Sequence, residues 1–144
     1  MKISTRGRYG IRLLIDLAEH INESHVSLAS VAERQAISIR YLEQVAVILR
    51  RAGFIRSVKG ASGGYTLAQL PQDIIIGDAL RELEGDMLII DPPLPHTTET
   101  KLQRCIRLTV FDRLNERIAG VIDRKTLASV VGTIDPDESY MYFI

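Results

Sequence analysis

One segment, residues 27–68, limits most strongly what this chain can fold into. Ser27 can cap a short helix, residues 36–38 can form a three-residue turn, and a second helix is expected over residues 39–52. A strand, a glycine-rich tip and a returning strand follow. Two helices around a tight turn and such a hairpin are typical of a winged helix-turn-helix, whose projecting second helix fits the major groove of DNA. We therefore predict a mostly α fold with a small β-hairpin wing.

Apolar residues recur at helical spacing on both sides of the turn. A first helix is expected from about Thr5 to Glu23. On its polar face Arg12 and Asp16 lie four residues apart, and we expect them to form a solvent-exposed ion pair. The inward residues are expected to be Ile11, Leu14, Ile15, Ala18 and Ile21 in the first helix, and Leu42, Val45, Ala46 and Leu49 in helix 39–52.

Helix 39–52, which we call the reading helix, turns polar side chains away from its apolar repeat. Arg40, Glu43 and Gln44 point outward, with Tyr41 at the edge and Ser38 as the cap. Arg can donate two hydrogen bonds to guanine, Gln can pair with adenine, and Glu can accept from the cytosine amine, with about 1–3 kcal/mol of discrimination per good pair. This face is predicted to read base edges.

The tip of the wing is rich in glycine. Lys59 and Ser62 lie there with Gly63 and Gly64, whose bare backbone would allow close approach to a phosphate group. A nucleotide-binding phosphate loop is the alternative, but no Gly-Lys-Ser/Thr triplet follows and the loop leads into a strand. We predict that Lys59, Ser62, Gly63 and Gly64 contact DNA.

The formal net charge of zero is the sum of two unlike halves. Residues 1–66 carry 10 basic and 5 acidic side chains, and the rest of the chain carries 8 basic and 13 acidic ones. The first half can attract a polyanion, whereas the second would repel one and suits subunit or regulatory contacts. Lys2, Arg6 and Arg8 can meet backbone phosphates if they lie beside the reading helix.

The second half contains a connecting region and a long helix. A helix is expected from about Gly77 to Leu83, followed by a stiff proline-rich linker. After capping by Thr97 or Thr98, a long helix is expected from about residue 99 to residue 121.

An apolar stripe follows one side of this long helix. One small domain cannot cover so long a stripe, so we predict that it packs against its copy in a second subunit. Such a dimer would set two reading helices one turn of DNA, about 34 Å, apart. Packing only on the chain's own core is the alternative. The predicted dimerisation residues are Leu102, Ile106, Val110, Leu114, Ile118 and Val121.

The expected organisation is a winged helix-turn-helix DNA-binding region over residues 1–70, a connecting helix and linker over 71–98, a dimerisation helix region over 99–135 and a tail over 136–144. No apolar run approaches the roughly 18 residues of a membrane span, and the N-terminal residues contain no apolar signal core. We expect a cytoplasmic protein without membrane contact.

Three motifs occur in order along the chain: Ser-Thr-Arg-Gly-Arg-Tyr at 4–9, Ile-Ser with Tyr-Leu-Glu-Gln at 37–44, and Lys-Gly with Gly-Gly-Tyr at 59–65. Together they resemble the winged-helix repressor family that includes the iron-sulfur cluster regulator IscR, the nitric oxide sensor NsrR and the cysteine metabolism repressor CymR. The resemblance runs the whole length, and the end of the chain, residues 140–144, is most similar to the cysteine metabolism repressor.

The resemblance implies a homodimer that binds a partly palindromic operator in double-stranded DNA. It implies that Lys59 of the wing enters the minor groove, where this family commonly has Arg. Lys is a compact point charge rather than a planar fork, which weakens the readout of a narrow minor groove. The residues implied to lie in the major groove are Ser38, Arg40, Tyr41, Glu43 and Gln44.

Family members that sense through iron-sulfur clusters use several cysteines after the connecting helix. Here that region offers Asp91, His96 and Glu99, and Cys105 is the one cysteine of the chain. A lone thiolate cannot hold a cluster in the four-cysteine manner, so we expect no cofactor and no metal. Cys105 falls outside the apolar stripe, and the alternatives for it are a redox switch and an inert structural cysteine.

The chain ends in an aromatic run with a free carboxylate: Tyr140, Met141, Tyr142, Phe143 and Ile144. This tail can pack within or across subunits, or insert the Ile144 carboxylate into a partner pocket. The resemblance favours insertion, because cysteine metabolism repressors are regulated through a complex with cysteine synthase (O-acetylserine thiol-lyase), which also accepts the isoleucine terminus of serine acetyltransferase.

We therefore expect a sequence-specific DNA-binding repressor of cysteine or sulfur metabolism genes, regulated through cysteine synthase. The alternatives are an iron-sulfur or redox-sensing repressor of the same family, and a protein-interaction module with weak DNA affinity. An enzyme is not expected, because the sequence shows no nucleophile-base pair, carboxylate dyad or cofactor loop.

Overall fold

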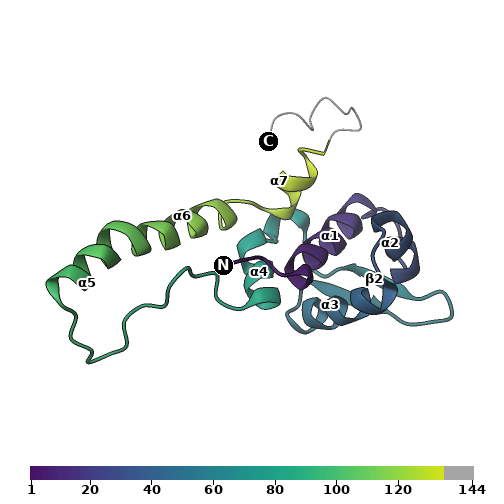
Figure 1. The fold of residues 1–144 in the computed structure, drawn as a ribbon. Helices are drawn as coiled ribbons and strands as arrows, with labels where there is room; N and C mark the ends of the chain where they lie inside the picture. The colour runs from purple at the N-terminus through teal and green to yellow at the C-terminus, as the bar shows by residue number, and fades with distance from the viewer. Residues whose placement is uncertain (135–144) are drawn as a thin grey trace.

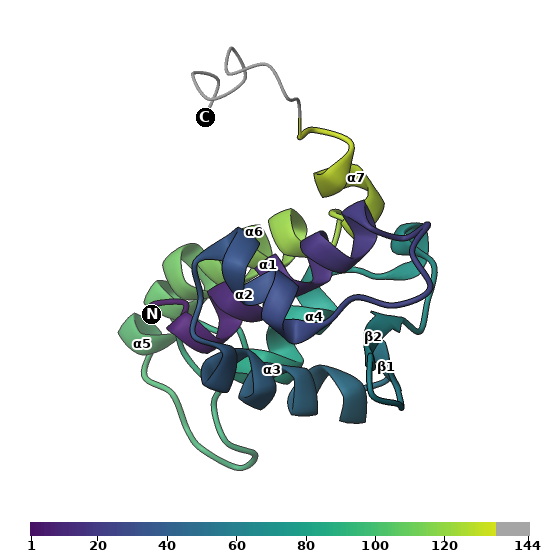
Figure 2. The same ribbon diagram turned by 90° about the vertical axis from the view of Figure 1, so that its right-hand side faces the viewer.

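The computed structural model describes residues 1–134, so the predictions for the tail at 136–144 lie outside the described residues. Figures 1 and 2 show α1 to α4 and the hairpin gathered in one body, from which the long helix extends. The mostly α fold with a small hairpin wing is confirmed. In chain order the helices and strands are α1 (Thr5–Glu19), α2 (Leu28–Gln35), α3 (Ile39–Arg51), β1 (Ile55–Val58), β2 (Gly64–Leu67), α4 (Ile76–Glu84), α5 (Lys101–Ile106), α6 (Asp112–Ile122) and α7 (Leu127–Val131), with a 3-10 turn at Pro71–Asp73 and a π-helical turn at Arg107–Phe111.

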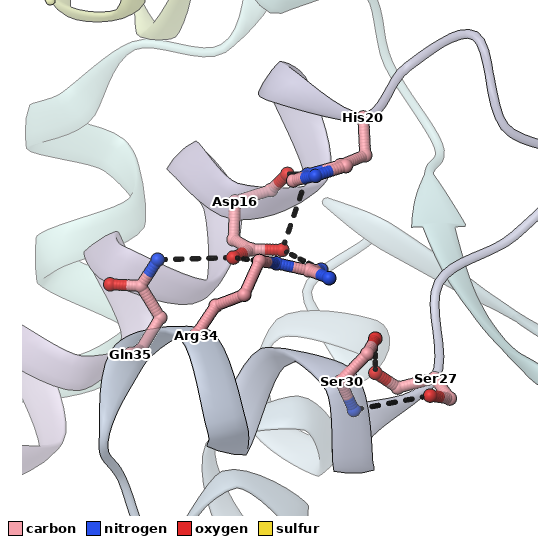
Figure 3. Close-up of polar contacts among 6 residues, drawn as sticks. All are labelled: Asp16, His20, Ser27, Ser30, Arg34 and Gln35. Atoms are coloured by element: carbon pink, nitrogen blue, oxygen red, sulfur yellow. Dashed lines mark hydrogen bonds and ion pairs between the residues drawn. The ribbon is translucent and has the colours of Figure 1, made fainter. Parts of the chain in front are cut away.

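Local capping places the helix-turn-helix where the sequence predicted it. The Ser27 hydroxyl caps α2 by accepting a hydrogen bond from the Ser30 N–H at 3.2 Å (Figure 3). Ala36 ends α2 in the left-handed conformation, with a φ of 52°. The Ser38 hydroxyl then caps α3 by accepting from the Tyr41 N–H at 3.4 Å. The turn and both helix starts follow from residues that are neighbours in sequence.

The core lies where α1, α3 and α4 meet. Leu13 and Leu14 of α1 are fully buried, and Leu83 of α4 is 1% exposed. Burial of such side chains is the main favourable term in folding, and it orients α3 with its polar face outward. The four residues of α3 predicted to face inward are all buried: Leu42, Val45, Ala46 and Leu49.

The start of α1 is anchored by α4. A Cβ on Gly7 or Gly10 would overlap the side chain of Glu84 or Leu83, so glycine allows the two helices to lie close together. Glu84 Oε1 accepts hydrogen bonds from the Ser4 N–H at 2.8 Å, the Ser4 hydroxyl at 2.6 Å and the Gly7 N–H at 3.1 Å. These bonds satisfy N–H groups that have no partner within α1.

Three sequence predictions for α1 are wrong. The helix ends at Glu19 rather than near Glu23, and Ile21 is 46% exposed instead of facing the core. Asp16 does not form a surface pair with Arg12 but is 1% exposed and faces α2. The expectation that charged residues four apart form a pair considers one isolated helix, whereas in the fold α2 packs against α1 at Asp16.

The wing is a short antiparallel hairpin tied to the loop that precedes α2. Ile55 lies opposite Leu67, and Val58 lies opposite Gly64. Val26 adds a bridge to Tyr65, with the N–H of each residue bonding the carbonyl of the other at 2.8 Å. The base of the wing is thereby fixed relative to α2.

The long helix is continuous from α5 through the π-helical turn into α6 (Figure 1). Its cap is Thr100, whose hydroxyl accepts from the Gln103 N–H at 3.2 Å, so the prediction of Thr97 or Thr98 is wrong. Thr100 is the cap because the Gln103 side-chain oxygen also accepts a hydrogen bond from the Thr100 N–H at 2.9 Å, which completes a capping box.

A short helix that the sequence did not predict, α7, returns the chain to the body. Leu127 of α7 is fully buried. The Leu127 N–H donates to the Ile74 carbonyl and the Ile76 N–H donates to the Lys125 carbonyl, both at 2.8 Å. Within residues 1–134, no helix has both the length and the apolar character that crossing a membrane requires.

Candidate nucleic-acid interface

The first turn of α3 presents a polar, accessible surface. The side chains of Ser38, Arg40, Glu43 and Gln44 are exposed, as their spacing predicted. Tyr41 is half-buried and packs edge-on against Tyr9 of α1, with ring centroids 5.3 Å apart. This contact brings the first turns of α1 and α3 together, and the sequence reading did not foresee it.

Three basic residues precede Tyr9 at the start of the chain. Lys2, Arg6 and Arg8 are exposed. Arg8 donates to the Thr5 hydroxyl at 3.2 Å, which leaves its guanidinium at the surface. The Tyr9–Tyr41 contact joins α1, which these residues begin, to the first turn of α3, and their contact with phosphates stays a prediction.

The wing tip places its predicted residues in two different environments. Lys59 and Ser62 are exposed, and the Ser62 carbonyl contacts His25 Nε2, which ties the tip to the loop before α2. Gly63 and Gly64 are half-buried rather than bare, because Gly64 begins β2 and lies against the Val26 carbonyl. Their small size serves packing within the wing.

A shallow hollow of about 350 Å³ joins α3 to the wing. Glu43 of α3 lines one side, and Gly63 and Gly64 line the other. Ala29 and Ser57 also line it, and the sequence reading had not singled them out. The first turn of α3 and the wing thus form one surface, and the Tyr9–Tyr41 contact joins the start of α1 to that turn.

A buried carboxylate holds α2 beneath this surface (Figure 3). Asp16 accepts from Arg34 Nε at 3.0 Å and Arg34 Nη2 at 2.6 Å, and from Gln35 Nε2 at 3.0 Å. Burial by itself raises the pKa of Asp16, but the hydrogen bonds from Arg34 and Gln35 and the nearby positive charge more than offset it, so the pKa lies below its usual value. The spacing within α1 gave no signal for this burial, because position 16 lies about 40° from Arg12 and about 100° from Leu17 around the helix.

The predicted dimerisation stripe is largely uncovered within residues 1–134. Leu102 is 70% exposed and Val121 is 62% exposed. Ile106, Val110 and Leu114 are exposed to a smaller degree, whereas Ile118 packs against the core of its own chain.

The π-helical turn keeps this stripe on one side of the helix. Steps of four residues drift by about 40° each on an α-helix, so Leu102 and Ile118 would differ by roughly 160° on a regular one. The Asp112 N–H bonds the carbonyl of Arg107, five residues earlier, so the turn holds one extra residue. That residue rotates α6 back by about 100°, which reduces the drift to roughly 60°. The sequence reading assumed a regular helix and missed this.

A family model described as "Rrf2: Iron-dependent Transcriptional regulator" matches residues 3–133. The HTH-type transcriptional regulator CymR of Bacillus subtilis (strain 168) is 36% identical over 145 residues, which cover 100% of both chains. The solved structure of this CymR, "the Global Cysteine Regulator of B. subtilis", superposes with a TM-score of 0.81 over 94% of this chain and 99% of that one at 36% identity. The structure of T. potens IscR gives a TM-score of 0.77 at 38% identity, over 99% of this chain and 97% of that one.

The side chains present do not fit an iron site. Cys105 is exposed, and Thr109 donates to its carbonyl at 2.6 Å. Both carboxylate oxygens of Glu99 are taken by Arg107, at 2.6 and 2.8 Å, and these hydrogen bonds hold the pKa of Glu99 below its usual value. In the described part of the chain, no three His, Cys, Asp or Glu side chains converge as metal ligands would.

Proposed function

This chain belongs to the Rrf2 family of transcriptional regulators, and from that premise we propose that it is a sequence-specific DNA-binding repressor acting as a homodimer. One observation carries the proposal: the exposed polar first turn of α3 lies beside the wing and contacts α1 near the basic start of the chain. It belongs to the half of the chain with 10 basic and 5 acidic side chains, whose field attracts the phosphate backbone.

In this proposal each part of the surface has its own task. Ser38, Arg40, Tyr41, Glu43 and Gln44 face base edges in the major groove. Lys2, Arg6 and Arg8 contact phosphates and position the protein without reading sequence. Lys59, Ser62, Gly63 and Gly64 bring the wing to the adjacent minor groove, where Lys59 supplies a positive charge.

The test is DNA binding by the full chain, with a duplex that the protein selects from a random pool compared with a scrambled duplex. Log affinity should fall steeply with log salt concentration. Arg40→Ala should relax base preference at one position, whereas Arg6→Ala should weaken both duplexes alike. Arg113→Ala, an exposed arginine of α6, is the matched control and should change neither. Equally poor affinity for every duplex at low salt would reject the proposal in favour of a protein-interaction module.

We further propose that the apolar stripe of α5 and α6 pairs with its copy in a second subunit. The exposure of Leu102, Val110, Leu114 and Val121 supports this, because a stripe of that length is costly to leave in water. A dimer also matches two reading helices to two half-sites.

For the regulated genes we propose cysteine or sulfur metabolism, with regulation in the cytoplasm through cysteine synthase. The likeness to a global cysteine regulator supports the first part. The run of aromatic and aliphatic residues from Tyr140 to Ile144 supports the second, since such side chains suit capture in a partner's pocket. Removing residues 140–144 should abolish binding to cysteine synthase and leave operator binding intact. Undiminished enzyme binding by the shortened chain would reject this part.

A further inference from the structure

We propose that Arg12 and Asp16 of α1 are positioning residues that set how the first turn of α3 meets the bases, and so determine sequence discrimination. The inference rests on the proposed function, because it concerns the same DNA surface. Neither side chain belongs to that surface: Asp16 is 1% exposed, and Arg12 is half-buried. They act through a chain of contacts that ends at Tyr41.

The first link joins Asp16 to the end of α2. Arg34 presents two donors to the two carboxylate oxygens, and Gln35 donates to Oδ2 at 3.0 Å (Figure 3). His20 Nδ1 lies 3.5 Å from Oδ1 on the remaining side. A carboxylate bound by a planar fork fixes direction as well as distance, whereas the apolar contacts around it do not.

The second link joins Gln35 to Arg12. Arg12 Nε donates to Gln35 Oε1 at 3.3 Å, and Arg12 Nη2 donates to the Gln35 main-chain carbonyl. Gln35 is the last residue of α2, and Ala36, with its φ of 52°, starts the turn. Two side chains of α1 therefore hold the backbone at the point where the chain turns toward α3.

The third link reaches the reading helix itself. The Arg12 guanidinium lies 5.6 Å from the centre of the Tyr9 ring, a cation-π contact. Tyr9 packs edge-on against Tyr41 in the first turn of α3. Bidentate pairing with a base tolerates little displacement, because hydrogen bonds weaken steeply with distance and angle. A small shift of this turn would thus degrade base reading while leaving phosphate contacts in reach.

The test uses the full chain, a duplex it selects from a random pool and a scrambled duplex. Arg12→Lys keeps the charge but removes the fork. It should lower the affinity ratio between the two duplexes by about tenfold, as one misplaced base contact would. The salt dependence of binding should stay unchanged, because the number of phosphate contacts does. Tyr9→Leu should lower the ratio in the same way, and Tyr9→Phe, which keeps the ring, should retain it.

The affinity ratio separates positioning from general stability. A variant that merely unfolds in part would lose affinity for both duplexes in proportion to its folded fraction, and the ratio would stay. Arg113→Lys, the same exchange at an exposed arginine of α6, should leave the ratio as it is. A wild-type ratio in the folded Arg12→Lys and Tyr9→Leu variants would overturn this inference alone. A wild-type protein that prefers no duplex would overturn the proposed function, and this inference with it.

Discussion

At the scale of single residues, Asp16 shows how one buried charge can serve as a joint between helices. Its carboxylate accepts three hydrogen bonds from α2 and lies next to His20. A buried charge is tolerated when it is paired and hydrogen-bonded, and it becomes costly once a partner is removed. The orientation of α2 should therefore depend on the ionised form of this one side chain.

Asp16→Asn should destabilise the fold and change how stability depends on pH. Removing the charge leaves Arg34 without its partner and should cost about 3 kcal/mol at neutral pH. The pKa of Asp16 is lowered in the folded state, so its contribution is present above the usual pKa and is lost as the pH falls through the folded value, that is, below about pH 4. Urea unfolding measured from pH 7 to pH 3 should show this loss in the wild type and less of it in the variant. Glu19→Gln, on the exposed side of α1, is the control, and an unchanged pH dependence in Asp16→Asn would contradict the prediction.

Two glycines should respond in opposite ways to alanine. A Cβ on Gly64 would overlap the backbone of Val26, so Gly64→Ala must push β2 away and should cost about 1–3 kcal/mol. A Cβ on Gly120 of α6 meets nothing within 4 Å, so Gly120→Ala should stabilise the helix by about 0.5–1 kcal/mol. Thermal unfolding measures the change in stability of each of these two variants. Gly64→Ala should also weaken operator binding, and equal effects of the two exchanges on stability would contradict the packing assigned to the wing.

Prediction from sequence succeeded for residues whose role depends on near neighbours. The caps Ser27 and Ser38, and the buried face of α3, follow from spacing over one or two turns. Asp16 was misplaced because its partners, Arg34 and Gln35, belong to another helix. The contact of Tyr9 with Tyr41 was missed for the same reason.

At the scale of elements, the π-helical turn of the long helix and the short helix α7 could not be predicted from the spacing of apolar residues. The sequence predicted the long helix because apolar residues recur along it, but the extra residue of the π-helical turn leaves the hydropathy pattern almost unchanged. α7 is only five residues long, too short for a periodic signal, and it forms because Leu127 fills a site in the core. Both features are decided by tertiary packing.

Inserting one alanine after Thr109 should weaken the dimer. The added residue turns Leu102 and Ile106 by about 100° away from the side of Leu114 and Val121. Each apolar side chain lost from an interface forfeits about 1.5–3 kcal/mol, so the dimer dissociation constant should rise by at least about tenfold. Sedimentation equilibrium measures it. Deleting Thr109 is the control and should dimerise normally, because the turn then becomes α-helical and loses only its surplus residue. An unaffected dimer in the insertion would show that the alignment of the stripe does not matter.

At the scale of the whole molecule, the basic charge and the exposed apolar stripe lie in different parts, the winged body and the long helix. The excess of basic side chains belongs to residues 1–66, which form most of the winged body. The long helix, from the acidic half, extends away from that body and carries the exposed apolar stripe (Figure 1). Contacts between copies can therefore form at the helix while α3 stays free.

This arrangement predicts that stability and DNA binding both depend on protein concentration. If two copies pair along the stripe, the midpoint of unfolding should rise with concentration, because association stabilises the folded state by mass action. Leu114→Glu with Val121→Glu places charges on the stripe and should abolish that rise. The monomer would retain one reading helix, so its affinity for the selected duplex should fall, and the slope of log affinity against log salt should drop to about half because half the phosphate contacts remain. Glu116→Gln, off the stripe on the same helix, should behave as wild type. A double variant with an unchanged slope would mean that one copy makes all the DNA contacts and that the stripe serves another partner.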